Sequence, residues 1–348
     1  MTELIRPGDH NEKVKDVQSR LRSLGHDIVD AAGYFGGTTK RAVRAFQQQR
    51  EILIDGIVGP NTWNELVEAS WRLGDRTLYL RHPYLRGDDV NTLQARLNAL
   101  GFDSGREDGI FGPETDVAVR AFQKEYATAE DGIFGPASHA ALAGLRVDRP
   151  GTSAKLREEL KKDLGPRLEQ AVVVIDPGHG GTDPGEVGTR GNREADLCWE
   201  LSTRLAEQLS IEGARVRFTH TEAEAPDSSE RARRANELQG DILVSIHLNS
   251  HEEWTAEGAS TYFFGGSHAG QTLAEKILDE LVMLGARDCR SHARSYTLLR
   301  ETRMPAVLVE PAFISNPDEE KKLEDSDHLN VLASSIVAAI RRYHEESL

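Results

Sequence analysis

The sequence predicts a multidomain protein in which two small all-α three-helix repeats precede a three-layer α/β domain with a mostly parallel sheet. Two observations predict this fold class. The first half of the chain repeats itself at one constant offset. In the second half, short β-branched runs alternate with amphipathic segments of helical period. We therefore expect repeats at 1–70 and 80–146, a linker at 147–170 and the α/β domain at 171–348.

The repeat rests on three segments that recur 76 residues further along the chain without a gap. The matching pairs are Val17–Gly25 with Leu93–Gly101, Ala42–Gln47 with Ala118–Gln123, and Asp55–Pro60 with Asp131–Pro136. Apolar residues at helical spacing open each copy, a glycine-rich turn follows, and Phe46 or Phe122 fills the core from the second helix. Thr62 and Ser138 are expected to cap the third helices.

The second half shows the alternation of strands and helices that a three-layer α/β domain requires. Strands are expected at Ala171–Asp176, Val216–Thr219, Ile242–Leu248, Ser260–Phe264 and Val307–Glu310. Helices are expected at Ala195–Leu209, Ser229–Glu237, Gln271–Leu284 and Leu329–His344. The strands read as buried because they are short and rich in β-branched residues, as in parallel sheets.

Composition narrows the class of protein. The chain has 348 residues and a formal net charge of −15, which argues against nucleic-acid binding because that needs a basic surface. No apolar run approaches the roughly 18 residues of a membrane span. Two cysteines, Cys198 and Cys289, are too few for a disulfide framework. The first residues lack the apolar run of a secretory signal, so we expect a cytoplasmic protein, or a cell-wall protein if a leader was removed before Met1.

Four residues are suited to metal binding or acid–base chemistry, and all but Glu194 lie at the ends of predicted strands. They are His179, Glu194, His247 and Glu310. The ends of parallel strands meet at one edge of a sheet, so these side chains are expected to converge. Two imidazoles and a carboxylate, with one position left open, are the ligand set of a catalytic zinc. His179 lies between glycines in a turn, where packing has little use for it.

The motifs that carry these residues resemble those of the zinc-dependent N-acetylmuramoyl-L-alanine amidases, the amidase 3 family. The segments Glu230–Asn236 and Leu298–Glu320 extend the resemblance beyond the candidate ligands. It implies a Zn²⁺ cofactor, with Glu310 as the catalytic carboxylate and the other three residues as ligands. Ala195 and Ala312 depart from the usual family pattern, but neither departure removes a ligand.

Three further polar residues are candidates to support the site: Asp176, Arg231 and Asn249. Asp176 is the candidate to orient the His179 ring, although an Asp before Pro-Gly often only closes a turn. Cys289 and His292 have a C-x-x-H spacing that suits a metal, but without partners they are expected to be structural. His220 belongs to no motif.

The repeats resemble the peptidoglycan-binding domain 1 family, whose signature reads DGxFGxxTxxAVxxFQ. The second copy, which begins this signature at Asp108, fits better than the first, where Ala32 and Gly37 stand for Asp108 and Pro113. The resemblance implies a peptidoglycan ligand, but the binding side chains stay unknown. The Gly, Phe and Leu positions that recur in both copies are expected mainly to build the fold.

Two classes of function follow from these resemblances. In the first, the protein hydrolyses the amide between the lactyl group of N-acetylmuramic acid and L-alanine, in peptidoglycan or its fragments. In the second, it resembles an actinobacterial cytoplasmic branch of the family and acts as a non-catalytic regulator that binds peptidoglycan precursors or a peptidoglycan-synthesis enzyme. The intact ligand set favours the enzyme, whereas the missing apolar leader favours the regulator.

Overall fold

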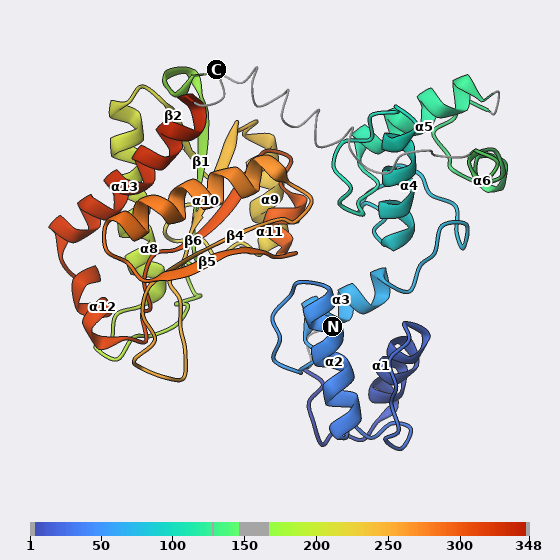
Figure 1. Ribbon diagram of the computed structural model, residues 1–348, viewed down its shortest axis with the longest axis horizontal. Helices are drawn as coiled ribbons and strands as arrows, with labels where there is room; N and C mark the ends of the chain where they lie inside the picture. Colours follow the sequence, from blue (N-terminus) through green and yellow to red (C-terminus); the bar gives the residue numbers. More distant parts are fainter. Residues whose placement is uncertain (1–3, 127–128, 146–166, 346–348) are drawn as a thin grey trace. The chain divides into compact units, whose positions relative to one another are not determined.

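The structure is a computed structural model that describes residues 4–126, 129–145 and 167–345. It divides into two compact units, Met1–Leu156 and Arg157–Leu348, which carry the helical repeats and the α/β domain (Figure 1). Most of the predicted linker 147–170 lies outside the described residues. Its described end is a 3₁₀ turn at Leu168–Gln170. Of the helices that the structure describes, none is long and apolar enough to cross a membrane.

The first unit is all-α in its described residues, as predicted. The first repeat contains α1 (Glu12–Ser23), α2 (Gly37–Gln49) and α3 (Pro60–Glu68), and the second contains α4 (Asp88–Ala99), α5 (Pro113–Glu125) and α6 (Pro136–Ala143). Each repeat has an apolar core of its own, in which Phe46 and Phe122 are buried. Burial of these rings explains why the same aromatic position recurs in both copies.

A buried glutamine ties each glycine turn to the helix that follows it. The Oε1 atom of Gln47 accepts a hydrogen bond from the Gly56 amide at 2.8 Å, and its Nε2 donates to Thr62 Oγ1 at 3.1 Å. The same arrangement occurs around three other glutamines: Gln18, Gln94 and Gln123. The Gly and Thr positions of the repeat signature therefore have a structural role in this chain.

This arrangement corrects one expectation about the third helices. Thr62 and Ser138 do not cap them, because α3 and α6 begin after Gly59 and Gly135. Both hydroxyls instead lie buried inside the first turn, where a glutamine side chain donates to them. Each hydroxyl therefore connects its own helix to the preceding one and does not cap the start of a helix.

The second unit is built on a six-stranded sheet with the order β2-β1-β3-β6-β4-β5. The strands are β1 (Val172–Pro177), β2 (Arg215–Phe218), β3 (Ile242–Ile246), β4 (Ala259–Phe263), β5 (Asp288–Ala293) and β6 (Ala306–Glu310). Four of them, β1, β2, β3 and β6, run parallel, while β4 pairs antiparallel with β6 and β5 runs parallel to β4. The predicted mostly parallel sheet is confirmed.

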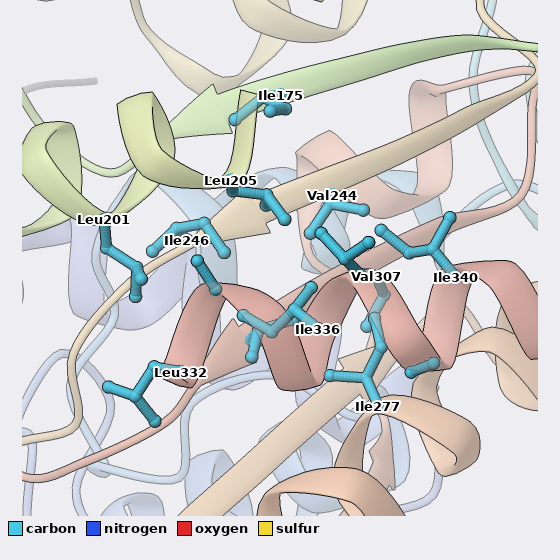
Figure 2. Close-up of a cluster of buried hydrophobic side chains, with 14 of the residues drawn as sticks. Ile175, Leu201, Leu205, Val244, Ile246, Ile277, Val307, Leu332, Ile336 and Ile340 are labelled. Atoms are coloured by element: carbon cyan, nitrogen blue, oxygen red, sulfur yellow. The ribbon is translucent and has the colours of Figure 1, made fainter. Parts of the chain in front are cut away.

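Helices cover both faces of this sheet (Figure 1). One face packs against α8 (Glu194–Ile211), α10 (His268–Met283) and α13 (Ser326–Glu345), and the other against α9 (Ser228–Glu237) and α11 (Thr297–Glu301). Strand residues alternate between the two layers, so Val244 belongs to the first core and Leu243 to the second. Figure 2 shows the first core, where Val244 lies among side chains of α8 and α13.

Three short elements of this unit were not predicted. They are the edge strand β5, the helix α11 and the helix α12 (Pro317–Leu323). The β5 segment reads DCRSHA, and a polar strand at a sheet edge shows no buried apolar run. The α12 segment is acidic and only seven residues long, and its start depends on the Asn316 side chain, which accepts from two backbone amides.

Candidate metal centre and active site

The topology brings three of the predicted residues to one edge of the sheet. His179 follows β1, His247 follows the neighbouring parallel strand β3, and Glu194 is the first residue of α8. Each of the three offers a ligand atom within 4.8 Å of the others. Among the residues that the structure describes, this trio is the group of histidine, cysteine and carboxylate side chains close enough to hold a metal ion.

Glu194 lies between the two imidazoles. Its Oε2 is 3.1 Å from Nε2 of His179, and its Oε1 is 3.0 Å from Nδ1 of His247. Backbone amides of Glu186 and Leu248 also donate to this carboxylate, which is almost fully buried. Burial disfavours the charge, but the hydrogen bonds from both histidines outweigh it and keep the pKa of Glu194 well below its ordinary value.

The His179 ring is oriented by Asp183. Oδ2 of Asp183 lies 2.8 Å from Nδ1 of His179, which leaves Nε2 of the ring facing Glu194. A carboxylate on the far nitrogen is a recurring partner of metal-binding histidines because it selects the tautomer and the ring direction. Burial opposes a charged ring, but the hydrogen bonds and charges of Glu194 and Asp183 raise the pKa of His179 to about 9.

Asp176 does not contact the His179 ring, so its expected role is corrected. Asp176 is fully buried and accepts from the hydroxyls of Thr219 and Ser245 at 2.6 and 2.8 Å. It also pairs with Nη1 of Arg231 at 3.2 Å. Asp176 lies two residues after Val174 on β1, so both side chains are on the face of the sheet that packs against α9, the helix that carries Arg231.

Arg231 connects Asp176 to the backbone of His179. Its Nη2 donates to the carbonyl oxygen of His179 at 2.7 Å, and its Nη1 also donates to the Pro177 carbonyl. His179 has a φ of 60°, a left-handed conformation that is strained for a residue with a side chain. Arg231 therefore holds the backbone turn that places the His179 ring.

His220 supports the same turn and was missed from the sequence. Its side chain is buried beside Thr219, and its Nε2 lies 3.1 Å from the His179 carbonyl oxygen. Burial and the positive charge of Arg231 lower the pKa of His220. Its position could have indicated a role at the site, because His220 follows the predicted second strand just as His179 follows the first.

Two glycines leave room for the trio. A Cβ atom on Gly178 would lie 2.7 Å from Cε1 and Nδ1 of His247. A Cβ atom on Gly185, where φ is 65°, would lie 2.6 Å from Cδ2 of His179. A larger residue at either position would push a candidate ligand out of place.

The loop before Glu194 is held by α12. The buried Glu320 accepts from Thr189 Oγ1 at 2.9 Å and from the Arg190 amide at 2.8 Å. Glu324 forms an ion pair with Arg190, with Nε and Oε1 2.8 Å apart. The helix that sequence reasoning missed therefore fixes the entry into α8 and with it the position of Glu194.

Glu310 ends β6 at the same edge of the sheet. Its Oε2 accepts hydrogen bonds from Ser260 Oγ and Tyr262 OH, each at 3.0 Å. Asn249 reaches it indirectly, because Asn249 Nδ2 donates to Ser260 Oγ at 3.2 Å. Burial raises the pKa of Glu310 above its ordinary value, although the two hydroxyl donors favour the carboxylate.

A cavity of about 630 Å³ opens beside His179. Its walls come from the loop that follows β1, from the start of α8 and from the segment after β2. Arg193, Asp196 and Trp199 line it on the α8 side. His179 is the member of the trio that lines this cavity, and a space of this size suits a small organic group.

The donor set of the trio fits zinc. Two imidazoles and one carboxylate are a ligand set of catalytic zinc sites, which leave one position open. The half-buried rings of His179 and His247 leave the trio accessible from one side, and Asp183 already occupies the far nitrogen of one ring. Cys289 and His292 offer no comparable site, since the His292 ring binds the Cys289 carbonyl oxygen and the thiol donates to Glu257.

Comparison with known proteins places both halves of the chain in known families. Residues 173–342 match the amidase 3 family, described as N-acetylmuramoyl-L-alanine amidase, and residues 10–66 and 86–142 each match a peptidoglycan binding domain. The N-acetylmuramoyl-L-alanine amidase CwlM of Mycobacterium tuberculosis is 39% identical to this chain, over 98% of the chain and 89% of CwlM.

Two other matches each cover about half of the chain. The Staphylococcus aureus protein named "Probable cell wall amidase LytH" is 31% identical, over 51% of this chain and 59% of its own length. The crystal structure of an N-acetylmuramoyl-L-alanine amidase from Clostridium difficile 630 is 32% identical with a TM-score of 0.49, over 51% of this chain and 98% of that one. The match to CwlM over nearly the whole chain, together with the family matches, shows that the chain belongs to the N-acetylmuramoyl-L-alanine amidase family, with two peptidoglycan-binding repeats ahead of the amidase domain.

Proposed function

We propose that the protein is a zinc-dependent hydrolase that cleaves the amide between the lactyl group of N-acetylmuramic acid and L-alanine. The substrate is peptidoglycan or a soluble fragment of it. The observation that carries the proposal is the convergence of His179, Glu194 and His247 within 4.8 Å of one another. Glu310 ends a strand at the same sheet edge and supplies the acid–base group that such a reaction needs.

His179, Glu194 and His247 would hold the zinc ion. When bound, zinc supplies a Lewis acid for the amide carbonyl and lowers the pKa of water. The protein's own part is to keep both rings and the carboxylate in place before the ion arrives. Asp183, Arg231 and the Leu248 amide do this through the contacts described above.

Glu310 would transfer the proton. Its carboxylate takes a proton from the attacking water as the carbon–oxygen bond forms, and returns it to the nitrogen as the carbon–nitrogen bond breaks. One group can serve as base and then as acid when its pKa lies near the working pH. Burial moves the pKa of Glu310 upward, in the direction that this double role requires.

A second candidate function is a cytoplasmic regulator of peptidoglycan precursor synthesis. It would bind a soluble precursor or a synthetic enzyme and leave the amide uncleaved. The net charge of −15 favours this alternative, because such a chain gains no electrostatic attraction to anionic wall polymers. We propose a cytoplasmic location on the same ground, and a cell-wall location if a leader is removed.

The deciding experiment combines metal analysis with an assay on a muropeptide that contains the lactyl–L-alanine bond. The enzyme should bind about one equivalent of zinc and release the peptide. Glu310→Gln is the matched control, because it should keep the zinc and lose the activity. Zinc below about a tenth of an equivalent after zinc is added back would rule out the metal site. Bound zinc without cleavage would favour the regulator.

Location is tested separately with the full chain. Cell fractionation should place the native protein with the cytosol, and the purified protein should bind intact sacculi weakly at physiological salt. Strong binding to sacculi, or native protein outside the membrane, would instead indicate a wall hydrolase whose repeats hold the polymer.

A further inference from the structure

One oxygen of Glu310 is occupied by two hydroxyl donors. Ser260 lies directly opposite Glu310 in the antiparallel pair of β4 and β6, and Tyr262 follows two residues later on the same face of β4. Both hydroxyls lie 3.0 Å from Oε2 of Glu310. No hydrogen bond from the described residues reaches Oε1. The two oxygens of this carboxylate therefore have different surroundings.

The Ser260 donor is itself held in place. Its Oγ accepts a hydrogen bond from Asn249 Nδ2 at 3.2 Å. The single proton of Ser260 has two acceptors within reach, Oε2 of Glu310 at 3.0 Å and the Tyr262 hydroxyl at 3.3 Å, and the shorter contact is to Glu310. Asn249 lies just beyond β3, two residues after His247. Its backbone N–H donates to the Ala312 carbonyl oxygen at 2.9 Å. Asn249 therefore links the end of β3 to Glu310 through the Ser260 hydroxyl.

The Tyr262 donor is held by its ring. The ring stacks on His292 with centroids 5.5 Å apart and packs against Tyr296 at 5.6 Å. The His292 ring is fixed in turn by a 2.8 Å contact with the Cys289 carbonyl oxygen. The C-x-x-H segment of the edge strand is thus linked to the site through the Tyr262 ring.

We propose that Ser260 and Tyr262 are positioning residues that hold Oε2 of Glu310 and leave Oε1 as the oxygen that takes up and returns the proton. This inference rests on the proposed amidase function. A proton on Oε2 would face two hydroxyl protons and would force one of them to turn away. A proton on Oε1 meets no such conflict, so the water proton goes to Oε1 and then to the leaving nitrogen.

The hydroxyls of Ser260 and Tyr262 also affect the pKa of Glu310. Burial raises the pKa of Glu310, and both hydroxyls lower it by stabilising the carboxylate. His247 lowers it and Glu194 raises it through their charges, and the Tyr296 hydroxyl is a further titratable group against the Tyr262 ring. Removing either hydroxyl should raise the pKa of Glu310, whereas the other neighbours stay in place.

The test uses Ser260→Ala and Tyr262→Phe in the zinc-loaded full chain. Each should lower kcat by about tenfold with little change in KM, because a charge-assisted hydrogen bond to the base is lost. The acid limb of the kcat/KM profile should move to higher pH, and zinc content should stay the same. Ser260→Thr keeps a hydroxyl and should restore most of the rate and the original pH profile.

A matched control is Ser210→Ala, which removes a hydroxyl from the far end of α8. Its Oγ binds only the Ala206 carbonyl oxygen among the described residues, about 24 Å along the helix from Glu194. The control should leave the rate, the pH profile and the zinc content unchanged. A change as large as in Ser260→Ala would mean that any lost hydroxyl disturbs the domain, and would overturn the positioning role.

A measurement without substrate separates this inference from the proposed function. Infrared spectra titrated with pH, with Glu310→Gln as the reference, report the carboxylate band of Glu310. The band should shift and titrate at higher pH in Ser260→Ala and Tyr262→Phe. An unchanged band together with an unchanged kcat would overturn the positioning role. A shifted band in a protein that cleaves nothing would support the positioning role and defeat the amidase function.

Discussion

Arg231 donates from Nη2 to the carbonyl oxygen of His179 at 2.7 Å, and so ties α9 to the strained turn that presents a candidate ligand. The same guanidinium pairs with the buried carboxylate of Asp176. Arg231→Met would leave Asp176 buried without its charge partner. We expect a loss of about 3–5 kcal/mol in the free energy of unfolding, measured by urea denaturation. Arg233→Met, at an exposed pair on the same helix, should change stability little.

Asp183 should matter for metal affinity more than for stability, since its side chain is about half exposed. Asp183→Ala removes the partner of His179 Nδ1 and frees the ring to turn. Zinc affinity should fall by about 10–100-fold, measured by competition with a chelator. Asp196→Ala, an exposed carboxylate in the first turn of α8, is the control and should keep the affinity. Equal losses in both variants would indicate a general effect of charge.

Glu310→Gln tests the proton transfer by a change that keeps the size of the side chain. Activity should fall by about 10²–10⁴-fold, while zinc content and thermal unfolding stay close to those of the unchanged protein. Steady-state kinetics and metal analysis on the same sample decide the outcome. Loss of zinc along with activity would make Glu310 a ligand, and retained activity would assign the proton transfer elsewhere.

The pH profile should reflect the raised pKa of Glu310. The base must be ionised to accept a proton, so kcat/KM rises with pH through the pKa of Glu310 in the free enzyme. Because burial raises that pKa above its ordinary value of 4.5, the rise should lie above this value. A profile that is already flat below this value would contradict the assignment. Glu310→Gln should lack this limb.

Substitution of Gln47 tests whether the repeat signature has a structural role. Gln47→Ala removes the acceptor of the Gly56 amide and the donor to Thr62. Stability of the first repeat should fall by about 1–3 kcal/mol, because buried polar groups lose their partners. The neighbouring Gln48 is exposed, and Gln48→Ala is the matched control with no expected change. Urea unfolding of the full chain gives both values, and equal stabilities would refute the role.

The sequence alone was sufficient for the fold class, because internal repetition and the period of apolar residues are local properties of the chain. Residue type and strand-end position also brought out His179, His247 and Glu310, since the ends of parallel strands share one edge of a sheet, and the family resemblance added Glu194. The three candidate ligands do converge in the structure. Their roles as zinc ligands, and that of Glu310 as the base, stay predictions.

The partners of these residues were decided by the tertiary structure. Asp183 and not Asp176 reaches the His179 ring, because the turn after β1 bends back through a left-handed residue. Ser260 meets Glu310 only because β4 enters the sheet antiparallel to β6, a direction that no periodicity in the sequence reveals. Hydrogen bonds are set by atoms that approach to about 3 Å, and contacts between residues distant in sequence depend on strand order and direction. Apolar patterning determines which face of an element is buried, but not which polar side chains meet across the sheet edge.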